Sequence, residues 1–317
     1  MSDWPELSEE RDGPTIKALH LYAQIAGKVA TAVLPWRNHG WHVTLHVGPR
    51  GYRTEPIHAA AGPFELEFDL VGHRFLMNMP DRDRAGFALE PMTVAAFYER
   101  VLSLLSEAGH IIPIHAAPNE VDPATPFMAD RAARPYDRDS VDRLRRALVS
   151  ADRVLRLFRS AFLGKVSPVH LFWGSFDLAV TRFSGRRAPL HPGGIPNLPD
   201  DVTREAYSHE VSSAGFWPGG AGAAGGPFFY SYAYPAPDGF AEARIRPEAA
   251  HYDKALGEFV LPYEAVRTGR EPDEVLLAFL ESSYAAAADL GAWDREALEC
   301  EQGQPGIPRA VQPPRNG

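Results

Sequence analysis

Apolar side chains in the first third of the chain recur at two different spacings. Over residues 15–34 the spacing is helical, with Pro14 in the first turn and Pro35 directly after the last one, so we expect a helix there. Residues 93–108 show the same spacing and are followed by Gly109, a typical helix C-cap. Two helices are therefore predicted before residue 110.

The segments between these helices alternate between apolar and polar positions, as half-buried strands do. Residues 64–70 place four apolar side chains on one face, and residues 73–79 complete a hairpin. Residues 41–47 also alternate and are predicted as a strand, which places His42 and His46 on one face about 13 Å apart, too far to bind one metal ion. The first part of the chain thus predicts an antiparallel sheet between two helices.

The second part of the chain repeats this order of elements. We predict an amphipathic helix over residues 141–162, a strand over 170–183 and a final helix over 273–290. The fold class that follows is α+β, with two similar helix–antiparallel-sheet–helix halves that suggest an internal duplication.

A Pro-rich segment without periodicity, residues 121–138, is predicted to connect an N-terminal half (1–120) to a C-terminal half (139–298). The second half contains a long loop-rich insertion, residues 184–258, and residues 299–317 are expected to form a disordered tail. Long irregular segments in compact domains are often functional, so we expect the insertion to contribute to a site.

Charge and composition exclude several classes of protein. The 317-residue chain has a formal net charge of -9, which argues against a partner that is bound through its phosphate backbone, as nucleic acids are. It contains a single cysteine, Cys300, so an intramolecular disulfide is excluded and a reducing compartment is indicated. We expect no export signal and no membrane span, and therefore a soluble cytoplasmic protein.

The most concentrated set of chemically capable side chains lies in the second half. We predict His209, Glu210 and Asp177 as catalytic residues, with acid–base roles for the first two. Neighbouring residues on a strand point to opposite faces, so His209 and Glu210 reach one ligand only if the backbone there is irregular. The alternative for His209 is a structural, hydrogen-bonded histidine.

An anionic small molecule is the ligand that the basic residues of this region favour. Guanidinium groups bind carboxylate and phosphate in pairs, and a glycine turn exposes backbone N–H groups. The predicted ligand-binding residues are Arg182, Arg186, Arg187, His191 and, from the first half, His42. The alternative for Arg186 and Arg187 is an ion pair with Asp200 and Asp201.

No dinucleotide, nucleotide-triphosphate, serine-hydrolase or thiol-redox motif occurs, so the sequence names no cofactor and no metal site. Three functions remain open: a small-molecule enzyme or binder, a noncatalytic interaction module that uses the aromatic loops at 216–220 and 228–235, and a metal-dependent hydrolase that uses His170, His191 and His209 with an acidic residue.

Four segments of the sequence resemble a known family. They are WPEL near the N-terminus, residues 19–47, residues 167–194 and residues 204–220. Over roughly residues 4–298 the chain resembles the bacterial family catalogued as domain of unknown function 5996. The resemblance implies a bacterial origin and transfers no catalytic residue.

Overall fold

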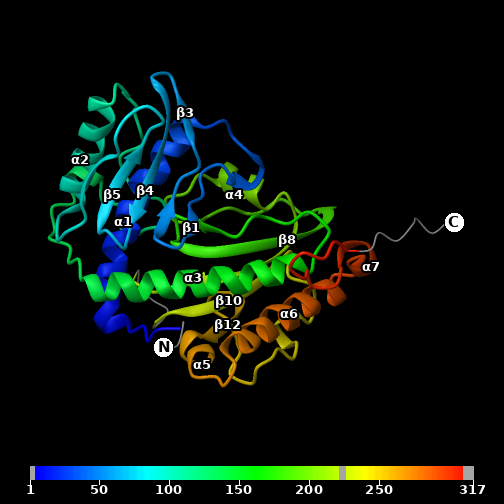
Figure 1. Ribbon diagram of the computed structural model, residues 1–317. Helices are drawn as coiled ribbons and strands as arrows, with labels where there is room; N and C mark the ends of the chain where they lie inside the picture. The colour runs from blue at the N-terminus through cyan, green and yellow to red at the C-terminus, as the bar shows by residue number, and fades with distance from the viewer. Residues whose placement is uncertain (1–3, 221–225, 310–317) are drawn as a thin grey trace.

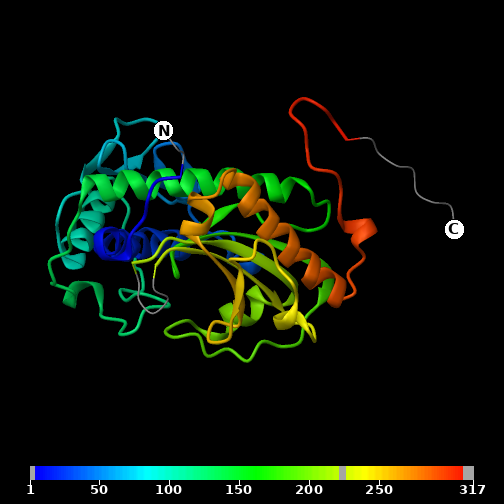
Figure 2. The ribbon, with the colours of Figure 1, turned by 90° about the horizontal axis from the view of Figure 1, so that it is seen from below.

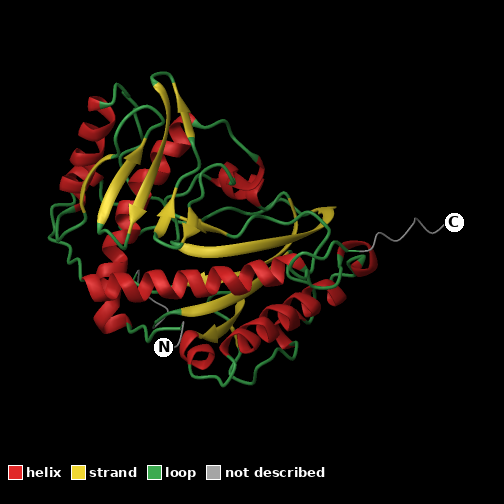
Figure 3. Ribbon diagram, in the orientation of Figure 1, coloured by secondary structure: helices red, strands yellow, loops and turns green. Residues whose placement is uncertain are grey.

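Two antiparallel sheets and the helices around them make up the computed structural model, which describes residues 4–220 and 226–309 (Figures 1 and 3). The predicted α+β class is confirmed. The first sheet has the strand order β1-β2-β4-β5-β6, with β3 paired to β4. Its strands are β1 (His46–Gly48), β2 (Gly51–Arg53), β3 (Ile57–Ala59), β4 (Gly62–Asp69), β5 (Arg74–Asn78) and β6 (Ala85–Ala88).

The second sheet is also antiparallel and has the order β11-β12-β10-β9-β8-β7. Its long central strands pair in register, with Leu178 opposite Phe216 and Phe229 also opposite Phe216. The strands are β7 (His170–Phe172), β8 (Asp177–Arg187), β9 (His209–Trp217), β10 (Phe228–Tyr234), β11 (His251–Asp253) and β12 (Glu258–Pro262).

Two helices, α3 and α6, contact each other and cover one face of the second sheet (Figures 1 and 2). No helix in the described ranges is both long and apolar enough to cross a membrane. The helices are α1 (Glu9–Val33), α2 (Val94–Glu107), α3 (Arg138–Ser160), α4 (Asp200–Ala206), α5 (Tyr263–Arg267), α6 (Pro272–Leu290) and α7 (Arg295–Leu298), with 3-10 turns at Asn38–Gly40, Phe127–Ala129 and Phe240–Glu242.

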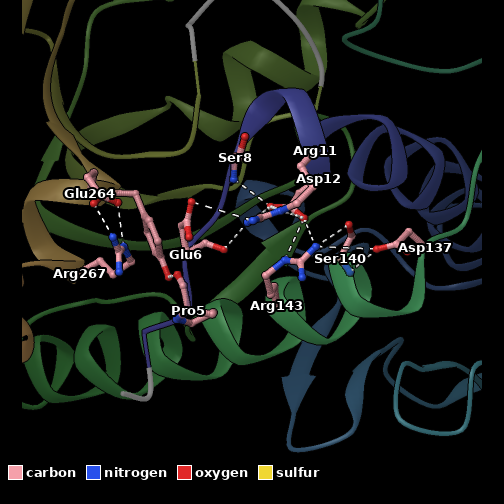
Figure 4. Close-up of polar contacts among 11 residues, drawn as sticks. Pro5, Glu6, Ser8, Arg11, Asp12, Asp137, Ser140, Arg143, Glu264 and Arg267 are labelled. Carbon is pink, nitrogen blue, oxygen red and sulfur yellow. Dashed lines mark hydrogen bonds and ion pairs between the residues drawn. The ribbon is translucent and has the colours of Figure 1, made fainter. Parts of the chain in front are cut away.

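Helix α1 begins earlier than predicted, at Glu9, because acidic residues stabilise its N-terminus. The carboxylate of Asp12, 1% exposed, accepts the backbone N–H of Ser8 at 2.8 Å and forms ion pairs with Arg11 and with Arg143 of α3 (Figure 4). Burial raises the pKa of Asp12, but these hydrogen bonds outweigh burial and lower the pKa to about 2. The start of α1 is thereby anchored to α3.

Two predicted strands are shorter than the alternation suggested. Residues 41–43 form turns rather than strand, because the preceding His39 and Gly40 have positive φ angles of 59° and 68°. His42 therefore does not share a strand face with His46. Residues 170–183 form the hairpin β7–β8 instead of one strand, with Phe176 at φ 61° in its turn.

The sheets meet edge to edge and share one core. Leu45 and Leu171 exchange backbone hydrogen bonds of 2.8 Å, which joins β1 to β7, and one buried apolar cluster extends from Trp4 to Trp293. The strand orders of the two sheets do not test the duplication, which stays a prediction. In the expected tail, Arg309 donates to the backbone of Ser160, residues 310–317 lie outside the described residues, and so do residues 221–225 of the insertion.

Candidate functional site

The face of the second sheet opposite α3 and α6 lines a cavity of about 870 Å³. Four other parts of the chain complete its walls: the C-terminal half of α1, the segment 36–43, the segment 113–124, and the segment from Ile195 through α4. Most of the lining is apolar or aromatic, and the aromatic residues are Trp36, Trp41, Phe172, Trp173, Phe183, Tyr207, Tyr230 and Tyr232. A concave, mainly apolar cavity with a few convergent polar groups is typical of small-molecule sites.

Strand β8 divides its side chains between this cavity and the core. Asp177, Ala179, Thr181 and Phe183 line the cavity. The intervening Leu178, Val180 and Arg182 are buried without lining it. The period of two is that of any strand whose faces meet different surroundings.

Asp177 is the polar centre of this wall. Its side chain is 8% exposed, and its carboxyl accepts hydrogen bonds from the hydroxyls of Ser175 and Tyr230. Burial raises the pKa of Asp177, although these two hydrogen bonds oppose the shift. No ion pair to Asp177 exists among the described residues, so an acidic group with a raised pKa faces the cavity.

Glu120 brings a second carboxyl to the same place from the other half of the chain. A Cβ atom on Gly174 would lie 2.0 Å from its Oε1 atom, so the carboxyl rests directly on the backbone of the β7–β8 turn. Burial and the nearby Asp177 raise the pKa of Glu120 to about 7. Two neighbouring carboxyls whose environments push their pKa values apart are one arrangement that proteins use for proton transfer.

Lys28 of α1 places a cation on the cavity wall. It is 5% exposed, its ammonium donates to Oδ1 of Asn119, and it lies 3.4 Å from Nδ1 of His115 and 5.3 Å from the centroid of the Trp173 ring. Burial lowers the pKa of Lys28 to about 8. No carboxylate in the described part of the chain lies within ion-pair distance of it.

The wall that carries Glu120 is fastened to α1 by side chains. Gln24 donates to the backbone oxygen of Asn119 at 2.9 Å and accepts its backbone N–H at 3.0 Å. The segment that begins at Ile195 holds it as well. The backbone N–H of Glu120 donates to the oxygen of Pro196 at 3.1 Å, and the side chain of Asn197 donates to the oxygen of Val121 at 2.7 Å. Segments far apart in the sequence thus form one continuous wall.

His39 lies at another part of the lining. Its backbone N–H donates to the carboxylate of Glu205 at 2.7 Å, and its ring nitrogens contact the backbone oxygen of Ala206 and the ammonium of Lys165. Burial lowers the pKa of His39. The His209 ring centroid is 6.1 Å from that of His39.

Among the predicted catalytic residues, the structure separates Glu210 from Asp177. Glu210 accepts the guanidinium of Arg186 at 2.7 Å and the hydroxyl of Ser184 at 2.8 Å, beside a small second cavity of about 190 Å³. Arg186 also donates to the oxygens of Gly291 and Ala292 at the end of α6. His209 contacts the hydroxyl of Ser208 at 3.1 Å and lines neither cavity.

The predicted ligand-binding residues are also dispersed. Arg182 lies on the covered face of β8, where its guanidinium carbon is 3.5 Å from the centroid of the Phe158 ring and 4.3 Å from that of Tyr284. Arg187 is exposed at the end of β8, and Asp200 and Asp201 pair with Arg204 rather than with Arg186 or Arg187.

The two histidines that were predicted to bind the ligand contact aromatic rings. The His191 ring stacks on that of Tyr207, with centroids 4.8 Å apart. The buried His42 accepts the backbone N–H of Arg37 at 3.2 Å and lies 4.8 Å, between ring centroids, from Trp36. Of the eight predicted site residues, Asp177 alone is in the lining of the large cavity.

Sequence reasoning missed Lys28, Glu120 and Asn119. His20, Gln24 and Lys28 stand four residues apart within residues 18–30, which are otherwise apolar, and this polar stripe indicates one shared surface. Glu120 and Asn119 had no such signal, because they belong to an irregular segment. Within residues 4–220 and 226–309, no three His, Cys, Asp or Glu side chains are grouped so that they would hold a metal ion.

Comparison with known families agrees with the resemblance found from the sequence motifs. A model described as a family of unknown function, DUF5996, matches residues 4–300. No match was found among curated proteins or among solved structures.

Proposed function

The chain belongs to the family of unknown function DUF5996, and we propose that it binds a small organic molecule in the large cavity. One observation carries the proposal. Lys28, Glu120 and Asp177 all line this cavity, Lys28 and Asp177 are buried and Glu120 is half-buried, and none has an ion-pair partner among the described residues. Buried charges are normally paired, so three unpaired ionisable groups around one space favour a ligand that supplies the missing partners.

The lining indicates the chemistry of this ligand. Aromatic side chains, among them Trp41, Trp173 and Tyr232, favour a flat, largely apolar body. The Lys28 ammonium favours a carboxylate or carbonyl oxygen, and the Glu120–Asp177 pair favours a hydroxyl or amine. An anionic small molecule thus stays in the proposal, with Lys28 as its counter-ion in place of the arginines of the second half.

Proton transfer is a second candidate function of the same site. The observation that favours it is the pKa of about 7 of Glu120 beside Asp177, since a general acid or base works best with a pKa near the operating pH. The measurement is the rate at which the bound ligand is converted, as a function of pH. A rate that changes near pH 7 in the wild type and does not change there in Glu120→Gln would support this candidate.

The two other functions are less well supported. The aromatic side chains of Phe216, Phe228, Phe229 and Tyr230 are buried rather than displayed as a contact surface. His170, His191 and His209 contact different neighbours and line no common cavity. A cytoplasmic location belongs to the main proposal, because Cys300, the one cysteine, has no partner with which to form a disulfide.

Thermal melting tests the proposal with three probes: 2-naphthoate, a naphthyl alcohol and a naphthyl amine. A ligand that binds only the native state stabilises it, by about 2.7 kcal/mol at a concentration 100 times its Kd. We expect 2-naphthoate to raise the melting temperature of the wild type and of Arg187→Ala, which lies outside the cavity, and to lose most of this effect in Lys28→Met. The proposal fails if no probe at millimolar concentration shifts the wild type.

A further inference from the structure

Lys28 differs in its surroundings from every other lysine of the chain. The sequence contains four lysines, and Lys17, Lys165 and Lys254 are exposed. Lys28 is 5% exposed, and the part of it that solvent reaches faces the large cavity. A ligand in the cavity therefore meets one lysine amine that the bulk solvent hardly reaches.

The groups around the Lys28 amine are neutral or weakly basic. They are the amide oxygen of Asn119, the Nδ1 atom of His115 at 3.4 Å and the face of Trp173. The acidic groups of the cavity, Glu120 and Asp177, form no ion pair with Lys28 and do not raise its pKa. Because no carboxylate holds its proton, burial favours the uncharged amine, and the pKa of Lys28 falls to about 8.

We propose that Lys28 is a nucleophile that forms an imine with the carbonyl group of an aromatic or otherwise apolar aldehyde or ketone bound in the cavity. This inference rests on the proposed function and specifies its substrate class. A desolvated lysine in an apolar pocket is the arrangement that makes an amine nucleophilic near neutral pH.

The bonds and protons of this step balance. The lone pair of Nζ attacks the carbonyl carbon, the carbonyl oxygen takes up a proton, and Nζ loses one, which gives a carbinolamine. Loss of the hydroxyl group as water, with a second proton supplied to it, leaves the carbon–nitrogen double bond. The His115 ring, 3.4 Å from Nζ, is placed to accept the proton that Nζ releases and to return one to the departing hydroxyl.

Reductive trapping on the full-length protein tests the proposal. The protein is incubated at about pH 7.5 with 2-naphthaldehyde and sodium cyanoborohydride, which reduces an imine to a stable secondary amine, and the labelled lysines are identified by mass spectrometry of peptides. At this pH roughly one Lys28 amine in four is uncharged, against roughly one in a thousand for an ordinary lysine. We expect Lys28 to be labelled at least about tenfold faster than Lys17 or Lys254.

Matched variants and a competitor sharpen the test. Lys28→Arg keeps the positive charge and should lose the label, whereas Lys165→Arg should keep it. His115→Gln should slow labelling of Lys28 and leave Lys254 unchanged. If Lys28→Arg does not fold, competition in the wild type replaces it: 2-naphthoate should protect Lys28 and none of the three exposed lysines.

The outcomes separate this inference from the proposed function. Equal labelling of all four lysines, or no label on Lys28 while 2-naphthoate still raises the melting temperature, overturns the imine and leaves a cavity in which Lys28 acts only as a cation. If neither the carboxylate nor the aldehyde interacts with the wild type, both proposals fail. Selective labelling of Lys28 that 2-naphthoate suppresses supports both.

Discussion

The two faces of the second sheet use the same strands for opposite purposes. On the covered face, Arg182 is packed between aromatic rings of α3 and α6, and its guanidinium also donates to the backbone oxygen of Phe158. On the open face, Asp177 and Glu120 keep carboxyls in a cavity without an ion-pair partner among the described residues. The guanidinium of Arg182 is thus enclosed by protein contacts, whereas the carboxyls of Asp177 and Glu120 have no cation beside them.

The two faces therefore differ in what they contribute to the free energy of unfolding. A buried charge that is stacked and hydrogen-bonded becomes part of the core, whereas a buried acidic group with a raised pKa costs free energy whenever it ionises. Changes on the covered face should therefore alter stability and leave binding intact. Changes on the open face should alter binding and the pH dependence of stability.

The largest effect is expected from Arg182→Ala. The change removes three ring contacts and a hydrogen bond and leaves a cavity, so the free energy of unfolding should fall by about 3 kcal/mol. Urea denaturation measures it, with Arg187→Ala at the exposed end of β8 as the control. A loss under about 1 kcal/mol would mean that the stack on the covered face is not stabilising.

An intermediate effect is expected from Glu120→Gln, and it depends on pH. A carboxyl with a folded-state pKa of about 7 and an unfolded value of 4.5 contributes stability below about pH 4.5 and loses it as pH rises to about 7. Replacing Glu120 by Gln removes this loss. The difference in free energy of unfolding between variant and wild type should therefore shift in favour of the variant by roughly 2 kcal/mol from about pH 5 to pH 8. The measurement is urea denaturation at both pH values.

The control for this prediction is Glu210→Gln, whose carboxyl is paired with Arg186 outside the cavity. It should not show a gain with rising pH. Parallel pH curves for wild type and Glu120→Gln would contradict the assignment of a raised pKa to the open face.

The smallest effect on stability is expected from Gly27→Ala, which tests how tightly α1 closes the cavity. An added Cβ would lie 2.2 Å from Cδ1 of Trp173, so the ring must move away from its place in the wall. Overpacking costs about 1–3 kcal/mol, and the better helix propensity of alanine returns about 1 kcal/mol, so a net loss of about 1 kcal/mol is expected. Probe binding should weaken with it.

Gly13→Ala is the matched control on the same helix. Its added Cβ would meet only the end of the Glu9 side chain, at 2.8 Å, whose carboxylate accepts the backbone N–H of Gly220 at 2.9 Å. The loss of stability should therefore be smaller than that of Gly27→Ala, and probe binding should not change. If Gly27→Ala leaves both stability and 2-naphthoate binding unchanged, Trp173 is not a fixed part of the wall.

Much of the fold could be predicted from the sequence, because periodicity marks strongly amphipathic elements. Helices α2 and α3 and the strands β4 and β5 appear where the apolar pattern placed them. The turns were harder. A non-glycine residue at positive φ, such as Phe176, interrupts a strand without changing the alternation of apolar and polar residues, so one strand was predicted where the structure has a hairpin.

The candidate site was less predictable for a physical reason. The sequence showed a group of capable residues near one another along the chain, and Asp177 and Arg182 were expected in one site. Side chains alternate between the two faces of a strand, so residues five positions apart point to opposite faces. Asp177 accordingly faces the cavity, and Arg182 faces the helices. The site instead joins α1, Glu120 and β8, whose proximity depends on tertiary packing.

The wall that holds Glu120 has a consequence for how new specificities would arise in this fold. The wall is attached to α1 by the side chains of Gln24 and Lys28, and to the segment after β8 by contacts of Pro196 and Asn197. Residues 113–124 contain no strand, so their length and composition can change without interrupting a sheet ladder. Substitutions, insertions or deletions in residues 113–124 would therefore change the ligand with the smallest loss of stability, and both sheets would stay as they are.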